Sequence, residues 1–226
     1  MLELGPGAGI ETIPLLLEGH RVFAVDISPG MLSVLRNRAE ESGVSNALET
    51  RAGPVGGLEG LLSDLSAGYF RGGFSTFGAL NLEPDLSRVP RALARVLAPD
   101  SPLFLAILNR YGVPPLLFSI LQGRLAEIRA RLADPIPPEG IGYPLALHAF
   151  TRGELARRFN PWFSLEGVEA VTVVSPTHYS HRLWAFTSPS GRASLARWDA
   201  RLTKRWPFRE LGEWTFVTFR RSWTPV

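Results

Sequence analysis

The stretch that decides the fold is Glu3-Leu4-Gly5-Pro6-Gly7-Ala8-Gly9, in which three glycines alternate with other residues. The apolar residues 2–4 predict a strand that ends here, and the apolar spacing over 10–18 predicts a helix that follows. A turn this tight needs residues without Cβ, and so does a ligand that lies against the backbone. The order of strand, glycine turn and helix therefore predicts a ligand-binding loop near the start of the chain.

The next unit repeats the strand and the helix, and its strand ends on an acid. Residues 21–26 (RVFAVD) predict a buried strand that ends at Asp26. Ser28 and Pro29 then give a strong helix start, an N-cap serine followed by proline at the first helical position. This alternation predicts an α/β fold built on a doubly wound parallel sheet, whose ligands bind in a crevice beyond the strand ends.

The rest of the chain continues the alternation after one interruption. Apolar runs predict strands over 47–52, 73–81, 103–108, 165–174 and 213–220, of which the one over 73–81 ends in a turn of small residues. Helical spacing predicts helices over 86–97 and 152–159. A helix that begins at Pro114-Pro115, with a leucine-rich stripe from Leu117 to Leu132, interrupts this order. Together with the proline- and glycine-rich residues 134–144, this helix indicates an insertion.

Composition excludes several kinds of site. The chain has 226 residues, of which 45% are apolar and 20% charged, as in an ordinary folded protein, and it has no cysteine. A disulfide framework, a thiolate metal site and a cysteine nucleophile are therefore excluded. The four histidines lack the spacing of a metal site, so we expect no bound metal.

There is no signal-peptide pattern and no apolar run of the ~18–20 residues that span a bilayer, which predicts a cytoplasmic protein without a membrane segment.

The charge distribution leaves an anionic partner open. The formal net charge is +3, but nine basic residues stand against three acidic ones from Arg182 onward. A solvated basic surface is the favoured interpretation, and binding of an anionic partner or substrate is the alternative.

The glycine stretch distinguishes two classes of cofactor loop. A dinucleotide-binding loop has the spacing G-x-G-x-x-G, but Ile10 occupies the position of its third glycine. The spacing G-x-G-x-G, with Glu3 two residues before it, resembles the first motif of the class I S-adenosylmethionine-dependent methyltransferases. Residues 26–32 (DISPGML) are similar to the D-x-S-x-x-M-L stretch of the small-molecule branch of that family, which includes the methyltransferases of types 11 and 25. Residues 75–81 and 93–102 resemble its fourth strand and the entry to its fifth, so the resemblance covers about residues 1–110.

The resemblance implies a fold, a cofactor and a set of binding residues. The fold is a Rossmann-like, doubly wound, seven-stranded sheet, mostly parallel with an antiparallel last strand, and the cofactor is S-adenosyl-L-methionine. Asp26 corresponds to the acid that holds the ribose hydroxyls, and Glu3 to the acid that orients the loop near the methionine end. The implied cofactor-binding residues are Glu3, Gly5, Pro6, Gly7, Gly9, Asp26, Ile27, Met31, Phe77 and Asn81. Structural roles remain as alternatives, as a helix cap for Asp26, a loop acceptor for Glu3, and core or turn positions for Phe77 and Asn81.

The sequence departs from the family pattern at three places. The chain starts inside the first predicted strand, so we expect the helical cap that usually precedes it to be missing or truncated. The third strand lacks a terminal acid in residues 51–54 that would contact adenine. Phe70 is followed by Arg71 where the family has an acid. Adenine recognition therefore has no assigned residue.

The resemblance predicts methyl transfer by in-line displacement, in which the protein mainly positions the reactants. A base is needed only where the nucleophile carries a proton, and Tyr143 and His148 are the weak candidates. Tyr111, Tyr143 and His148 are the candidate substrate residues. For His178 and His181, with Tyr179 between them, we expect structural roles.

The predicted organisation is a single methyltransferase domain over 1–226. It divides into a cofactor-binding core over 1–110, a helical lid or substrate insertion over 111–150, and a helix with closing strands over 151–226. The helix over 113–133 is a candidate lid or homodimer surface.

Two alternatives to a small-molecule methyltransferase stay open. An RNA methyltransferase would need a basic, aromatic surface, and the carboxyl-terminal region offers Arg197, Trp198, Arg201, Lys204, Arg205, Trp206, Phe208 and Arg209. The helical spacing of this stretch predicts that it packs its helix onto the protein, so a nucleic acid partner is not favoured. A degenerate cofactor-binding or scaffolding domain is the non-enzyme alternative.

Overall fold

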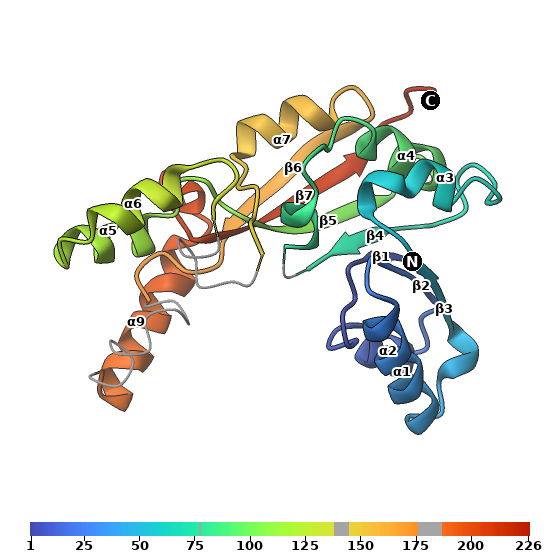
Figure 1. Ribbon diagram of the computed structural model, residues 1–226, viewed down its shortest axis with the longest axis horizontal. Helices are drawn as coiled ribbons and strands as arrows, with labels where there is room; N and C mark the ends of the chain where they lie inside the picture. The colour runs from blue at the N-terminus through green and yellow to red at the C-terminus, as the bar shows by residue number, and fades with distance from the viewer. Residues whose placement is uncertain (77, 138–144, 176–186) are drawn as a thin grey trace. The chain divides into compact units, whose positions relative to one another are not determined.

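The computed structural model describes residues 1–76, 78–137, 145–175 and 187–226 (Figure 1). Seven strands among these residues form one sheet in the order β3-β2-β1-β4-β5-β7-β6. The strands are β1 (Leu2–Leu4), β2 (Val22–Asp26), β3 (Leu48–Ala52), β4 (Gly73–Ser75), β5 (Pro102–Leu108), β6 (Phe163–Ala170) and β7 (Trp214–Arg221). The order reverses at β1 and β4, which is the switch point at which such sheets bind ligands.

Strands β1 to β5 are parallel. Leu2 of β1 pairs with Phe23 of β2 on one side and with Gly73 of β4 on the other. Strand β3 continues the sheet beyond β2, and β5 continues it beyond β4, with Ser75 opposite Leu105. The carboxyl ends of these strands therefore point in one direction.

Strands β7 and β6 complete the sheet, and β7 runs antiparallel to both of its neighbours, β5 and β6. Against β5, the N–H of Asp100 donates to the carbonyl of Arg221 and that of Asn109 to the carbonyl of Glu213, both at 2.9 Å. Residue numbers therefore rise along β5 as they fall along β7, as an antiparallel pair requires. The predicted seven-stranded, mostly parallel sheet is confirmed.

Four helices flank the parallel strands, α1 (Thr12–Leu17), α2 (Pro29–Glu41), α3 (Leu58–Leu61) and α4 (Val89–Val96). Figure 1 shows α1 and α2 on one side of β1–β3, and α3 and α4 on the other. The apolar stripe of α2 explains its place, because Leu32, Leu35 and Ala39 are at most 1% exposed and pack with residues of α1 and β2. Burial of these side chains fixes the strands that carry the glycine loop and Asp26.

The chain divides into two compact units. The first comprises 1–105, 156–166 and 218–226, and the second 106–155 and 167–217. Helices α5 (Val113–Leu121), α6 (Leu125–Leu132) and α9 (Pro189–Leu202) belong to the second unit, while α7 (Arg152–Phe159) begins in the second unit and ends in the first. Short 3₁₀ helices lie at Ser45–Ala47, Val55–Gly57, Ala79–Leu82 and Phe208–Glu210. The proposed division into 1–110, 111–150 and 151–226 remains a prediction.

The single helix expected along the Leu117–Leu132 stripe is wrong. The chain forms α5 and α6, which pack on each other and are separated by a turn at Gly123 with φ +68°. The turn is closed by the N–H of Arg124, which donates to the carbonyl of Ser119 at 2.9 Å. Glycine adopts this left-handed conformation at little cost, so it ends a helix that leucine spacing alone would continue.

The strand expected over 73–81 forms as β4 and ends at Ser75. The turn of small residues expected after it forms at Gly78, whose φ of +73° leads the chain into the 3₁₀ helix Ala79–Leu82. One other expectation is corrected. The aromatic residues near the carboxyl end do not pack their helix down, because Trp198 and Trp206 are 52% and 74% exposed.

Helix α9 is instead anchored by a buried acid. Asp199 is 8% exposed, and its carboxylate accepts hydrogen bonds from the backbone N–H groups of Val173, Val174 and Ser175.

Within the described ranges, no helix is both long enough and apolar enough to cross a membrane.

Candidate functional site

The glycine loop joins β1 to α1, and three left-handed glycines shape it. Gly5, Gly7 and Gly9 have φ angles of +72°, +52° and +80°, a region that other L residues rarely adopt. The N–H of Gly5 donates to the carbonyl of Val25 (2.8 Å), and the N–H of Gly9 donates to the carbonyl of Pro6 (2.9 Å). The backbone alone therefore fixes the shape of this loop.

The three glycines serve different purposes. A Cβ at Gly5 would clash with the Cβ of Ala79, and one at Gly9 would clash with the Cδ1 of Leu35, so both positions are needed for close packing of the protein. A Cβ at Gly7 would meet none of the described atoms within 4 Å. Gly7 is therefore the point at which a ligand can approach the backbone.

Asp26, at the end of β2, connects the loop with the start of α2. Its Oδ2 accepts a hydrogen bond from the N–H of Gly7 (3.0 Å), and its Oδ1 accepts one from the N–H of Ser28 (2.8 Å). Ser28 caps α2, since its Oγ accepts from the N–H of Met31 (3.3 Å). Each carboxylate oxygen has a further lone pair, so Asp26 can keep these bonds and also accept hydroxyl groups of a ligand.

Glu3 is a buried acid directly before the loop. It is 1% exposed; its Oε2 accepts a hydrogen bond from the Oγ1 of Thr12 (2.7 Å), while its Oε1 has no partner among the described residues. The pKa of Glu3 is raised to about 7, mainly by burial of the carboxyl group. The hydrogen bond from Thr12 lowers the pKa, while the negative charges of Glu11 and Asp26 add to the increase. An unsatisfied buried carboxylate oxygen is costly, and a cationic or N–H donor of a ligand would satisfy it.

The remaining predicted residues of this site differ in burial. Pro6 is buried in the loop, and Asn81 is 0% exposed in its 3₁₀ helix, where its N–H donates to the carbonyl of Gly78 at 2.8 Å. Ile27 and Met31 are 67% and 48% exposed at the start of α2. Phe77 lies outside the described residues.

The loop region as a whole has the properties of a site for a polar, partly cationic ligand. It offers an open backbone at Gly7, carboxylate lone pairs at Asp26 and an unsatisfied buried oxygen at Glu3. These groups fit a ligand that brings hydroxyl donors and a positive charge, as a sulfonium nucleoside with an amino-acid end does. The fit rests on the shape and chemistry of the chain's own residues.

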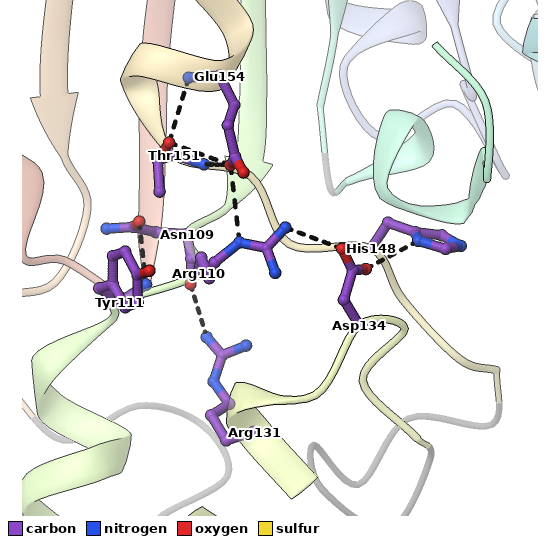
Figure 2. A network of polar contacts seen from close by, with 8 residues as sticks. All are labelled: Asn109, Arg110, Tyr111, Arg131, Asp134, His148, Thr151 and Glu154. Carbon is purple, nitrogen blue, oxygen red and sulfur yellow. Dashed lines mark hydrogen bonds and ion pairs between the residues drawn. The ribbon is translucent and has the colours of Figure 1, made fainter. Parts of the chain in front are cut away.

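A second polar cluster follows β5, and Figure 2 shows its side chains. The guanidinium of Arg110 donates to Oδ2 of Asp134 at 2.9 Å, and the other oxygen of Asp134 lies 3.0 Å from Nδ1 of His148. Burial of Asp134 opposes its ionisation, but the hydrogen bonds from Arg110 and His148 hold the pKa of Asp134 below its usual range. Asp134 therefore lies between Arg110 and His148, with one carboxylate oxygen facing each.

Arg110 is also tied to the start of α7. Its Nε lies 3.6 Å from Oε2 of Glu154. That oxygen accepts hydrogen bonds from the N–H (2.7 Å) and the Oγ1 (3.0 Å) of Thr151, and the N–H of Glu154 donates back to Oγ1 of Thr151 (3.2 Å). This reciprocal pair is a helix-capping box, so the cluster is fixed to the first turn of a helix.

The substrate candidates are only partly described. Tyr111 is 55% exposed, and its N–H donates to Oδ1 of Asn109 at 3.3 Å. His148 is 22% exposed and belongs to the cluster with Asp134. Tyr143, His178 and His181 lie outside the described residues. Within the described ranges, no group of three or more histidine or acidic residues is arranged to hold a metal ion.

Four residues of these two clusters are not predicted from the sequence: Thr12, Arg110, Asp134 and Glu154. The T-x-x-E spacing of Thr151 and Glu154 was a readable signal for the capping box. The partnership of Asp134 with His148 has no local signal, because 14 positions and a proline-rich stretch separate them.

Comparisons with known proteins find similarity to methyltransferases. Residues 1–100 match the sequence model of the family described as "Methyltransferase domain". Over 113 residues, the chain is 30% identical to the ubiquinone biosynthesis O-methyltransferase of Xanthomonas euvesicatoria pv. vesicatoria (strain 85-10). That match covers 49% of this chain and 43% of the relative, so the chain matches less than half the length of this curated protein.

Solved structures extend the likeness of the fold to nearly the whole chain. A SAM-dependent methyltransferase from Methanosarcina mazei has a TM-score of 0.64 at 15% identity and covers 98% of this chain and 91% of its own. The geranyl diphosphate C-methyltransferase of Streptomyces coelicolor A3(2), solved with S-adenosyl-L-homocysteine, has a TM-score of 0.59 at 14% identity, with 97% and 70% covered.

Proposed function

We propose that this chain, whose first 100 residues match the methyltransferase-domain model, is a class I methyltransferase that transfers a methyl group from S-adenosylmethionine to a small molecule. The observation that carries the proposal is the glycine loop at the switch point of the sheet, with open backbone at Gly7 between two acids. Matches to methyltransferases in sequence and in fold support it.

Three groups of this chain would hold the cofactor. Gly7 lets its backbone come close, Asp26 accepts the ribose hydroxyls, and Oε1 of Glu3 accepts a donor from the cationic amino-acid end. When bound, the sulfonium supplies a methyl group that is already activated for in-line displacement. The remaining task of the protein is to orient the acceptor and exclude water.

The acceptor is a hydroxyl group in this proposal. Its support is the O-methyltransferase relative, whose match covers 49% of the chain. A hydroxyl nucleophile carries a proton near neutral pH, so a general base is useful. His148 stays a predicted base together with Tyr143, and its Nδ1 lies 3.0 Å from Oδ1 of Asp134. Tyr111 and Tyr143 stay predicted substrate residues.

Other parts of the proposal rest on sequence alone. A cytoplasmic location, a lid role for residues 111–150 and a homodimer through 113–133 stay predictions. The basic residues of α9 leave nucleic acid binding open but unfavoured, and the matched relatives named above support a small-molecule acceptor instead.

Calorimetry with S-adenosylmethionine, followed by a transfer assay with a panel of small hydroxyl compounds, tests the proposal. We expect binding of the cofactor with a 1:1 stoichiometry and release of S-adenosylhomocysteine with at least one of these acceptors. Absence of cofactor binding by a protein shown to be folded would contradict it and would favour the scaffolding alternative.

A further inference from the structure

We infer that a pocket at the amino ends of β2, β3 and β4 is a second binding site, which takes an anion that carries a planar ring, such as a nucleoside monophosphate. This amino-end pocket lies within the first compact unit and has a volume of about 440 Å³, which falls in the range of small-molecule sites, about 300–1,000 Å³. Its lining includes Arg21, Asn46, Glu49, Tyr69, Phe70 and Arg71. The inference does not depend on the proposed function, because none of residues 3–9 lines the pocket.

The amino-end pocket lies at the opposite edge of the sheet from the glycine loop. Arg21 directly precedes β2 and Asp26 ends it, and these positions are roughly 16 Å apart along the strand at about 3.3 Å per residue. Asn46 belongs to the 3₁₀ helix before β3, and Arg71 lies just before β4. A ligand in this pocket would therefore not occupy the place proposed for the cofactor.

Two arginine side chains of the pocket are available to an anion. Arg21 and Arg71 are exposed, and within the described ranges neither guanidinium has an ion pair or a hydrogen-bond acceptor. Glu49 is the acid of the lining, and it lies 3.6 Å from Arg51, which is outside the lining. The lining side chains therefore carry an excess of positive charge. A guanidinium offers paired N–H donors that match the oxygens of a phosphate or a carboxylate.

Aromatic side chains supply a surface for a planar ring. The buried rings of Phe23 and Phe70 meet edge to face, with centroids 5.5 Å apart. The ring of Tyr69 packs against Phe70 at 4.9 Å and 83°, and Tyr69 is still 52% exposed. Tyr69 is thus held by one aromatic contact and leaves surface on which a planar ring can stack. An anion with such a ring uses both the arginines and the tyrosine.

Two further polar side chains suit the sugar of a nucleotide. The side-chain amide of Asn46 has no hydrogen-bond partner in the part of the chain that the structure describes, and the side chain of Glu49 is 57% exposed. An amide both donates and accepts, and a carboxylate accepts, so both side chains can bind sugar hydroxyl groups. A ring, sugar hydroxyls and an anionic group are the parts of a nucleoside monophosphate.

The backbone that carries the arginines and the tyrosine is held by neighbouring elements. The N–H of Phe70 donates to the carbonyl of Val96, and the carbonyl of Phe70 accepts from the N–H of Ala98, both at 2.9 Å. These bonds tie residues 69–71 to the end of α4. Arg21 directly precedes a strand that is paired on both sides. Binding therefore orders side chains but not the main chain, which reduces its entropic cost.

Titration of the full chain with uridine 5′-monophosphate, followed by nitrogen-15 NMR, tests the inference. We expect the amide signals of residues 46–49 and 69–71 to shift. Uridine lacks the anion and ribose 5-phosphate lacks the ring, so each should bind about tenfold more weakly or worse. Orotate, a planar ring with a carboxylate, shows whether a carboxylate can replace the phosphate. Absence of binding by both uridine 5′-monophosphate and orotate, or equal binding of uridine, would overturn the inference, as would shifts confined to residues 5–9.

Variants test which side chains bind the ligand. Arg71→Gln and Tyr69→Ala should each weaken binding of uridine 5′-monophosphate by about tenfold, which corresponds to about 1.4 kcal/mol. Arg91→Gln is the matched control, since Arg91 is an exposed arginine of α4 outside the pocket, without a partner among the described side chains, and it should bind as the wild type does. Wild-type affinity in both Arg71→Gln and Tyr69→Ala would refute the site. Failure of the wild type to bind S-adenosylmethionine would contradict only the proposed function.

Discussion

Replacing Glu3 with glutamine should change the stability of the ligand-free protein in a pH-dependent way. The side chain is 1% exposed and only one of its oxygens is satisfied by Thr12. Glutamine has nearly the same shape but no charge. The substitution therefore removes the burden of a buried carboxylate while it leaves the packing in place.

The magnitude follows from the pKa of Glu3. Burial raises it to about 7 from an ordinary value of 4.5, and each unit corresponds to about 1.4 kcal/mol, so the effect is on the order of 3 kcal/mol. Because the folded state has the higher pKa, it binds the proton more tightly than the unfolded state. The contribution of this proton to stability is complete below pH 4.5 and is lost as the pH rises through about 7.

Urea unfolding at pH 5 and pH 8 measures this effect. Relative to the wild type, Glu3→Gln should gain about 2.5 kcal/mol more unfolding free energy at pH 8 than at pH 5, slightly less than the full effect because pH 5 lies above the unfolded pKa of 4.5. Glu18→Gln, at an exposed position after α1, is the matched control and should show no such difference. If the wild type and Glu3→Gln keep a constant difference across this range, Glu3 is not a buried carboxylate with a raised pKa, and the reasoning fails.

Three further substitutions test other parts of the account. Asp26→Ala should weaken binding of S-adenosylmethionine by about 1–3 kcal/mol in calorimetry, since it removes a charged acceptor; unchanged affinity would refute the placement of the ribose. Asp199→Ala leaves three backbone N–H groups without their acceptor, so thermal and urea unfolding should show that the free energy of unfolding falls by about 1–3 kcal/mol. An unchanged unfolding curve would show that other contacts anchor α9. Gly123→Ala forces a left-handed alanine between α5 and α6 and should cost about 1 kcal/mol in the same assay; a gain in stability would mean that the two helices can join.

Local patterns were sufficient to predict most of the fold. The glycine spacing, the acid at Asp26 and the Ser28-Pro29 helix start depend on short-range steric and capping rules, and the structure has each of them. The helix predicted over 152–159 forms as α7 with the same bounds. Buried apolar runs also located β2 and β5, because strands covered on both faces have almost no polar residues.

Long-range contacts could not be predicted in the same way. The leucine stripe continues through Gly123, so spacing favoured one helix although the backbone turns there. Trp198 and Trp206 are exposed, and α9 is held by the hydrogen bonds of Asp199 to residues after β6. The helical spacing of apolar residues within α9 does not predict such a contact with a distant segment. Pairs such as Glu3 with Thr12 require the folded backbone to bring them together.

Titration of S-adenosylmethionine into the wild type and into Gly7→Val tests the central claim most directly. A Cβ at Gly7 would meet no described protein atom within 4 Å, so valine there acts through the space a ligand would occupy and through the strain of φ +52°. Gly19→Val, at φ +88° and equally open among described atoms, is the matched control for that strain. The account predicts that the wild type and Gly19→Val bind the cofactor and that Gly7→Val, shown to be folded, does not. Wild-type affinity in Gly7→Val would contradict it.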